Sequence, residues 1–231
     1  MSTQADQAAS GPVLILDAVE ARILGALIEK EATTPEAYPL TANAVVLACN
    51  QKNNRDPVLE LEPGEVGHAL RELEARGLVR SVHGARAQRY EHRFAQAYSV
   101  TVRQQAVLSV MLLRGPQTVA ELLNRCERLS AFADGDEVRQ TLERLVQRNP
   151  TLVIKLGRAA GQREDRYMHL LCGEVDESAF AQAPRTTPAI RWRIFGWSGR
   201  PKRRALRLAT GRAPIVNTSR RMPPTPVAAP W

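Results

Sequence analysis

Residues 63–94 read PGEVGHALRELEARGLVRSVHGARAQRYEHRF, and their pattern is the most informative part of the sequence for predicting the fold. It opens with a proline, which suits the first turn of a helix, and Gly77 suits the end of one. The apolar residues that share one face of this helix are Val66, Leu70 and Leu73. Residues 78–82 and 89–94 then have the pattern of two β-strands joined by a short loop. We therefore expect a helix followed by a β-hairpin.

Two more helices are expected upstream of this stretch. Asp17 and Glu20 have the spacing of a capping box, and apolar residues at helical spacing follow as far as residue 31. Thr41 can cap a second helix that runs through Cys49, and the polar segment 50–57 interrupts it. The order of elements is then three helices and a hairpin.

The same order returns in the second half of the chain, which is stronger evidence than any single element. Residues 107–112 repeat the apolar spacing of residues 23–28, Thr118 begins a second helix with a capping box, and Asp134 caps a third. Strands are expected at residues 152–156 and 166–171. The sequence predicts a mainly α fold with small β-hairpins, built from two tandem winged-helix domains of the helix-turn-helix type.

The predicted domains divide the chain into four parts. Residues 14–97 form the first winged-helix domain and residues 98–175 the second. Residues 1–13 are expected to be a disordered N-terminus. Residues 176–231 are expected to be a disordered basic tail, because they are rich in proline and arginine and have no sustained apolar period.

Three stretches of the chain resemble a known bacterial family. They are LDAVEARILGALIEKEATTPEAYPLTANAVVLACNQKNNRDPV at residues 16–58, RYEHRF at residues 89–94, and LRGPQTVAELLNRCERLSAFAD at residues 113–134. Together they are similar to the YceH-type family, whose members are tandem winged helices without an established biochemical role. The resemblance covers roughly residues 14–175. It supports the fold but leaves the function open, because winged helices bind DNA, bind proteins or dimerise.

The net charge of +8 is concentrated at one end of the chain. Residues 1–175 hold 21 Lys and Arg against 22 Asp and Glu, whereas residues 176–231 hold 11 basic and 2 acidic residues. Any phosphate binding by the first 175 residues must therefore come from local clusters of basic side chains.

Several classes of protein do not fit the sequence. No apolar run is long enough to span a membrane and no secretory signal is present, so we expect a cytoplasmic protein. Cys49, Cys126 and Cys172 are expected to be buried free thiols in a reducing compartment. We find no phosphate loop, metal-ligand spacing or nucleophile motif, and therefore expect no cofactor, no metal site and no enzymatic activity.

Nine side chains are candidates for binding nucleic acid. Arg80, Arg86, Arg89 and Arg93 lie in the first hairpin, or wing, and such a hairpin can reach backbone phosphates. Arg139, Gln140 and Arg144 lie on the third helix of the second repeat, where a helix-turn-helix protein reads base edges. Lys52 and Arg55 lie in the polar segment 50–57.

Each of these groups also has a structural interpretation. The third helix of the second repeat can be a solvated face held by pairs such as Glu137 with Arg144 or Glu143 with Arg139. Arg55 can pair with a carboxylate such as Glu60 and fix the connection between helices. The third helix of the first repeat is a poor candidate because its outer face is partly acidic.

The predicted function is a non-enzymatic DNA-binding or transcription-regulator-like protein, with double-stranded DNA as partner. The alternative is a winged-helix module that binds another protein, or a second copy of itself, without binding DNA. The segment 191–212, RWRIFGWSGRPKRRALRLATGR, interleaves basic and aromatic residues that can bind acidic surfaces, membrane headgroups or single-stranded nucleic acid. A displaced reading frame is a further hypothesis for the composition of this tail.

Overall fold

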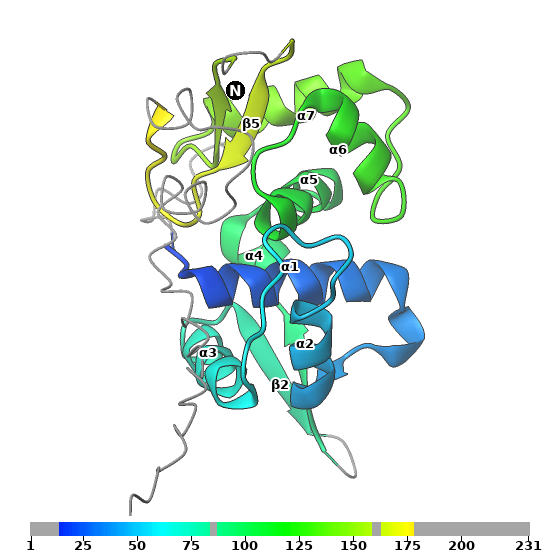
Figure 1. The fold of residues 1–231 in the computed structure, drawn as a ribbon, viewed down its shortest axis with the longest axis vertical. Coiled ribbons are helices and arrows are strands. Elements are labelled where there is room, and N and C mark those ends of the chain that lie inside the picture. The colour runs from blue at the N-terminus through cyan, green and yellow to red at the C-terminus, as the bar shows by residue number, and fades with distance from the viewer. Residues whose placement is uncertain (1–13, 84–86, 159–162, 178–231) are drawn as a thin grey trace, which may run out of the picture. The chain divides into compact units, whose positions relative to one another are not determined.

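The computed structural model describes residues 14–83, 87–158 and 163–177, and all of them belong to one compact unit (Figure 1). The fold is mixed α/β, with helices and two small antiparallel sheets. The first repeat contains α1 (Ala18–Thr33), the short 3-10 helix η1 (Pro35–Ala37), β1 (Leu40–Thr41), α2 (Ala42–Cys49), α3 (Pro63–Ala75), β2 (Val79–His83) and β3 (Gln88–His92). The rest contains α4 (Phe94–Tyr98), α5 (Val102–Arg114), α6 (Val119–Cys126), α7 (Gly135–Gln147), β4 (Val153–Leu156) and β5 (Arg166–His169).

The predicted helix starts are confirmed by their hydrogen bonds. The Asp17 carboxylate accepts from the backbone N–H of Glu20 while the Glu20 carboxylate accepts from that of Asp17, both at 2.8 Å. Thr118 and Glu121 form the same reciprocal pair at the start of α6. Asp134 caps α7 by accepting from the N–H of Glu137 at 2.9 Å. These caps satisfy backbone donors that a helix start would otherwise leave open.

The sheets differ from the prediction in the ends of two strands and in one additional strand. The predicted strands 89–94 and 166–171 end at His92 and His169, and Phe94 begins the unpredicted helix α4. The first sheet has three strands in the order β1–β3–β2, because Leu40 pairs with Tyr90 beside the predicted hairpin. In the second repeat a single bridge joins Gln117 to Tyr167 next to the β4–β5 hairpin. The sequence did not predict β1, because a strand of two residues is too short to show an alternating apolar pattern. The extra pairing falls at matching places, just before the second helix of each repeat.

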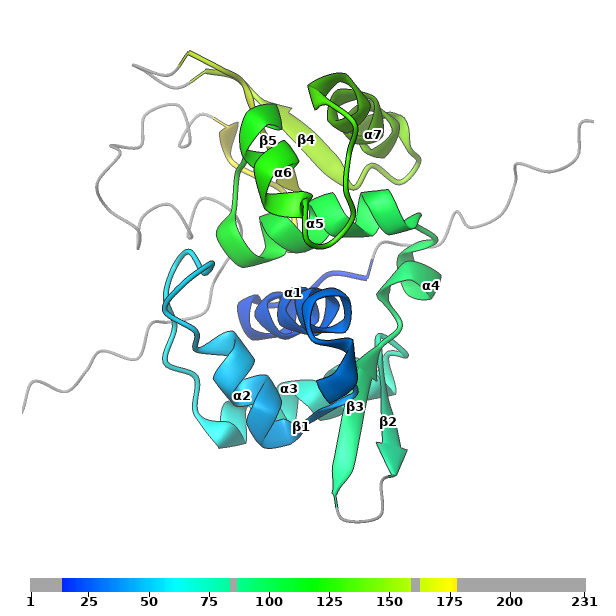
Figure 2. The same cartoon turned by 90° about the vertical axis from the view of Figure 1, so that its right-hand side faces the viewer.

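The two repeats pack through their first helices, and Figures 1 and 2 show α1 and α5 side by side. Gly25 allows this close approach, since a Cβ atom there would lie 2.9 Å from Leu113 Cγ. The buried residues of both repeats form one continuous core, which includes Leu24, Leu27 and Leu108. The division into domains at residues 97 and 98 stays a prediction.

Some expectations concern parts of the chain outside the described residues. They are the disorder of residues 1–13 and of the tail from residue 178, and the position of Arg86 in the first hairpin. Among the described helices, none combines the length and the apolar character that crossing a membrane requires.

Candidate nucleic-acid interface

Arg55 fixes the 50–57 loop from inside the protein. Its side chain is 0% exposed, and its Nη1 and Nη2 atoms donate to the two carboxylate oxygens of Glu29 at 3.1 and 2.5 Å. Further bonds run to the carbonyl oxygens of Ala48 and Asn54 and to the side-chain oxygen of Gln51. Every donor of the guanidinium is used, so the structure contradicts a phosphate-binding role for Arg55. It pairs with a carboxylate, as in the structural interpretation, but with Glu29 and not Glu60.

A second buried arginine and an asparagine anchor the same loop. Arg22 donates to the carbonyl oxygens of Cys49 at 3.2 Å and Pro57 at 2.8 Å, and burial lowers its pKa to about 10. The Asn50 side chain pairs with both backbone groups of Leu61, at 2.8 and 2.9 Å. The loop is therefore held by three polar side chains, which explains most of its unusual composition.

Lys52 remains available at the surface of this loop. It is exposed and lines a pocket of about 360 Å³ together with Lys30 and Arg128. The one carboxylate in this pocket lining, Glu29, is already paired with Arg55. Unlike Arg55, Lys52 therefore keeps its ammonium group available at the surface.

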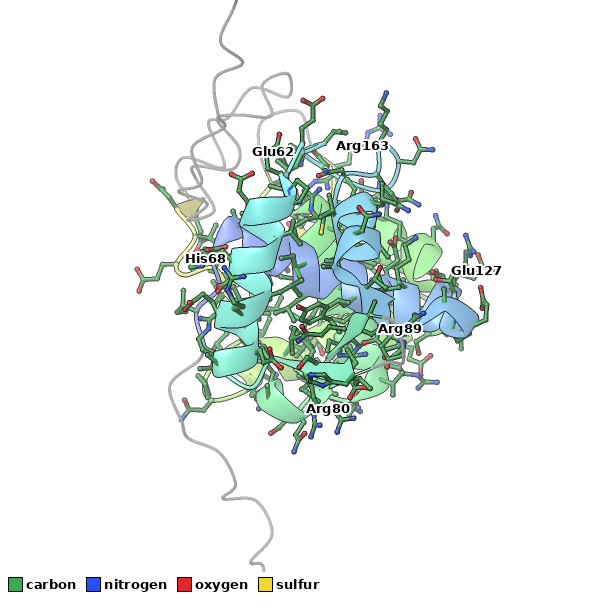
Figure 3. The ribbon with its side chains drawn as sticks, turned by 90° about the horizontal axis from the view of Figure 1, so that it is seen from below. Glu62, His68, Arg80, Arg89, Glu127 and Arg163 are labelled. Atoms are coloured by element: carbon green, nitrogen blue, oxygen red, sulfur yellow. The ribbon has the colours of Figure 1, made fainter. Side chains whose placement is uncertain are left out.

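In the first hairpin Arg80 and Arg89 are exposed (Figure 3) and Arg93 is half-buried, and all three have weak internal partners. Arg80, whose side chain is 57% exposed, pairs with Glu91 at 2.7 Å. Arg89 donates to the carbonyl oxygen of Pro39 at 2.8 Å, and Arg93 donates to the Gln96 side chain. Exposed pairs contribute at most about 1 kcal/mol each, so a phosphate can replace such a partner at little cost.

The outer face of α7 differs from the predicted ladder of ion pairs. Neither predicted pair forms: Arg139 contacts Asp136, and Glu137 contacts Arg103 of α5. The acidic groups in the first turn of α7 are thus matched by basic partners.

Gln140 and Arg144 are exposed on α7 and make no hydrogen bond or ion pair with any described residue. Gln147, which we did not select from the sequence, is exposed in the same way and continues this row at helical spacing. We call Gln140, Arg144 and Gln147 the α7 stripe. Glu143 is its exposed acidic neighbour.

The corresponding helix of the first repeat presents a different surface. His68 lies on the solvent side of α3 (Figure 3), and Arg71 and Glu72 are exposed beside it. Glu74 accepts a hydrogen bond from the N–H of Ser81 at 3.0 Å and so ties α3 to the wing. With mixed charge and no amide side chain, this face offers fewer groups for reading base edges than α7.

The second hairpin keeps most of its charge paired. Lys155 and Arg158 both contact Asp165, at 2.9 and 3.3 Å, while Arg166 contacts Glu121 at 2.7 Å. We did not select these residues from the sequence. All three pair with carboxylates, whereas Arg80 is the one described arginine of the first hairpin that does so.

Comparison with known sequences identifies the family. The sequence profile of the family described as "Protein of unknown function, DUF480" matches residues 16–162. The chain belongs to this family. The DUF480 match includes the 50–57 loop, the first hairpin and α7, and it confirms the resemblance to YceH-type proteins.

Three relatives of this DUF480 chain are UPF0502 proteins from other bacteria. The one from Xanthomonas campestris pv. campestris (strain B100) is 57% identical over 181 residues, covering 78% of this chain and 81% of the relative. The one from Stenotrophomonas maltophilia (strain K279a) is 57% identical, covering 76% and 80%. The one from Pseudomonas aeruginosa (strain UCBPP-PA14) is 55% identical, covering 75% and 77%.

The titratable groups of this DUF480 chain do not gather into a metal site among the described residues. Burial raises the pKa of the Cys49 and Cys126 thiols to about 12, which keeps both protonated at neutral pH. Burial lowers the pKa of His169 on β5 to about 4, so its ring is neutral there. These groups serve packing in the structure.

Proposed function

We propose that the chain is a non-enzymatic, cytoplasmic, regulator-like protein whose two repeats are winged helices and which binds double-stranded DNA. The α7 stripe is the observation that carries the proposal. Arg and Gln are side chains that pair with the edges of guanine and adenine in the major groove. In the α7 stripe they are exposed, aligned and not engaged with any described residue.

The backbone contacts of this proposal come from the first wing and the 50–57 loop. Arg80, Arg89, Arg93 and Lys52 supply cations at the surface, and Arg86 belongs to the same wing in sequence. Arg139 stays beside the α7 stripe and can exchange Asp136 for a phosphate. The near-neutral balance of residues 1–175 limits the number of such contacts, so the expected affinity is modest and depends on salt.

The test is binding of fluorescent duplex DNA by the full-length chain, measured by anisotropy. Changing Gln140, Arg144 and Gln147 to Ala together should weaken binding by about tenfold or more, because each good base contact contributes about 1–3 kcal/mol. Arg71→Ala on α3 is the matched control, since it removes one exposed arginine from the third helix of the other repeat. Equal affinity of the wild type and the triple variant would refute the role of α7.

The alternative function, a protein-interaction module, is favoured by a different observation. Leu47 on α2 and Val58 are 64% and 51% exposed, which is high for large apolar side chains. If Leu47 joins two copies, light scattering should detect a dimer that Leu47→Ser abolishes. A monomer at all concentrations would exclude self-association through Leu47.

A further inference from the structure

A second polar pocket, of about 230 Å³, lies where the 50–57 loop meets the second repeat. The N–H of Asp56 donates to the carbonyl oxygen of Leu113 at 2.9 Å, and the Arg114 guanidinium donates to the Asn54 side chain. These contacts join the loop to the end of α5. The pocket lining comes from the loop, α5, α6 and β5, so both repeats contribute to it.

The charge in this pocket is unbalanced. Four arginines line it, namely Arg55, Arg114, Arg125 and Arg166, against two carboxylates, Asp56 and Glu121. Arg55 is fully engaged with Glu29 and backbone oxygens. Arg166 holds Glu121 at 2.7 and 3.3 Å and also donates to the carbonyl oxygen of Pro116. Glu121 is therefore paired with Arg166.

Arg114 and Arg125 keep most of their donors available. Arg125 is oriented by the Gln117 side chain, and its nearest Glu121 oxygen is 3.8 Å away. Arg114 donates to Asn54. Among the described residues, the Nε–H groups of Arg114 and Arg125 have no acceptor. The two guanidiniums thus offer several N–H groups to the same pocket.

These two arginines also repel one another. The pKa of Arg114 lies below its usual value, first because of burial and next because of the nearby charge of Arg125. A doubly charged anion between them would remove this repulsion, and guanidinium groups match phosphate oxygens in bidentate geometry. Gln117 is buried, its Nε2 donates to the carbonyl oxygens of Gly115 and Pro116, and its Oε1 accepts from Arg125, so it orients Arg125 before an anion binds.

We propose that this pocket binds a small phosphate-bearing anion through Arg114 and Arg125, and that the bound anion joins the two repeats. The pocket has the volume for a phosphate or diphosphate group. Its two available arginines, Arg114 and Arg125, are half-buried, which fits one small free anion. This site is separate from the α7 stripe and does not depend on DNA binding.

The test is titration of the full-length chain with inorganic pyrophosphate in a calorimeter. One saturable site is expected, and Arg114→Gln and Arg125→Gln should each weaken it by about tenfold or more, because each removes a charge-assisted bidentate contact. Arg71→Gln, which removes an exposed arginine on α3 outside the pocket, is the matched control and should change the affinity by less than about twofold. The basic tail is present in every variant, so its own binding cancels in the comparison.

A second measurement needs no substitution and covers a variant that fails to fold. Hydrogen exchange of the wild-type chain should slow on adding pyrophosphate at residues 54–56 and 114–117. Protection confined to residues 178–231, or equal affinity in all variants, would overturn the proposal. Displacement of pyrophosphate by duplex DNA would overturn the assignment to a small free anion.

Discussion

The Ser109 hydroxyl donates a hydrogen bond to the carbonyl oxygen of Gly25, at 3.2 Å, across the contact between α1 and α5. The two residues occupy the same position in the two repeats, because each is the eighth residue after its N-cap, Asp17 or Thr101. Equivalent positions that meet each other indicate that the repeats face one another about a local two-fold axis. The first helices therefore act as the internal interface of the molecule.

Gly25→Ala tests this interface. The new Cβ atom would lie 2.9 Å from Leu113 Cγ and 3.1 Å from Leu112 Cβ, so one side chain must shift. Overpacking of this kind costs about 1–3 kcal/mol, against a gain of at most about 1 kcal/mol in helix propensity. We expect a lower free energy of unfolding in urea. Gly64→Ala, where nothing lies within 4 Å, should be neutral or slightly stabilising, and a Gly25 variant more stable than the wild type would contradict the packing.

The pair of Arg55 and Glu29 should be essential for stability. Arg55→Ala leaves Glu29 without its bidentate partner and frees the carbonyl oxygen of Ala48. Breaking a buried pair costs about 3–5 kcal/mol in unfolding free energy. Lys52→Ala, three residues earlier but exposed, should change stability by less than about 0.5 kcal/mol. Equal effects of the two substitutions in urea melts would show that Arg55 does not anchor the loop.

His169 should make stability depend on pH. Its pKa falls from the ordinary 6.5 to about 4 on folding because the ring is buried. The unfolded chain therefore binds a proton at a higher pH than the folded chain, so stability is complete above pH 6.5 and decreases as the pH falls toward 4. Between these two pH values the free energy of unfolding should fall by about 3 kcal/mol. His169→Gln removes this contribution, and its unfolding free energy should vary less between these pH values than that of the wild type. If the unfolding free energies of the wild type and His169→Gln changed with pH in parallel, His169 would not be the source of the pH dependence.

The first wing should determine the salt dependence of DNA binding. Arg80→Ala and Arg89→Ala together remove two phosphate contacts in the proposed complex, so the slope of log affinity against log salt should become shallower by about 2. Sequence preference should stay the same, because backbone contacts carry no base information. An unchanged slope would remove the wing from the interface.

The sequence alone was sufficient for the features that depend on near neighbours. The Asp17 and Thr118 caps and the repeated apolar spacing of α3 and α7 are local patterns, and the structure contains them. The partner of Arg55 could not be found in this way, because Glu29 lies 26 residues away and reaches it only through the fold.

The charges of α7 show the same limit. The predicted i, i+4 and i, i+7 pairs were plausible by spacing, but Glu137 is drawn to Arg103 on another helix. Gln147 was not selected from the sequence because it is a candidate only by its alignment with Gln140 and Arg144. That alignment depends on α7 extending to residue 147, which the structure shows.

Hydrogen exchange of the full-length chain, with and without duplex DNA, tests the central proposal most directly, because it locates the contact surface in the unmodified protein. We predict slower exchange in α7 around residues 139–147 and in the first hairpin at residues 79–93 when DNA is bound. Slower exchange only in residues 178–231, with α7 and the hairpin unchanged, would instead assign DNA binding to the basic tail.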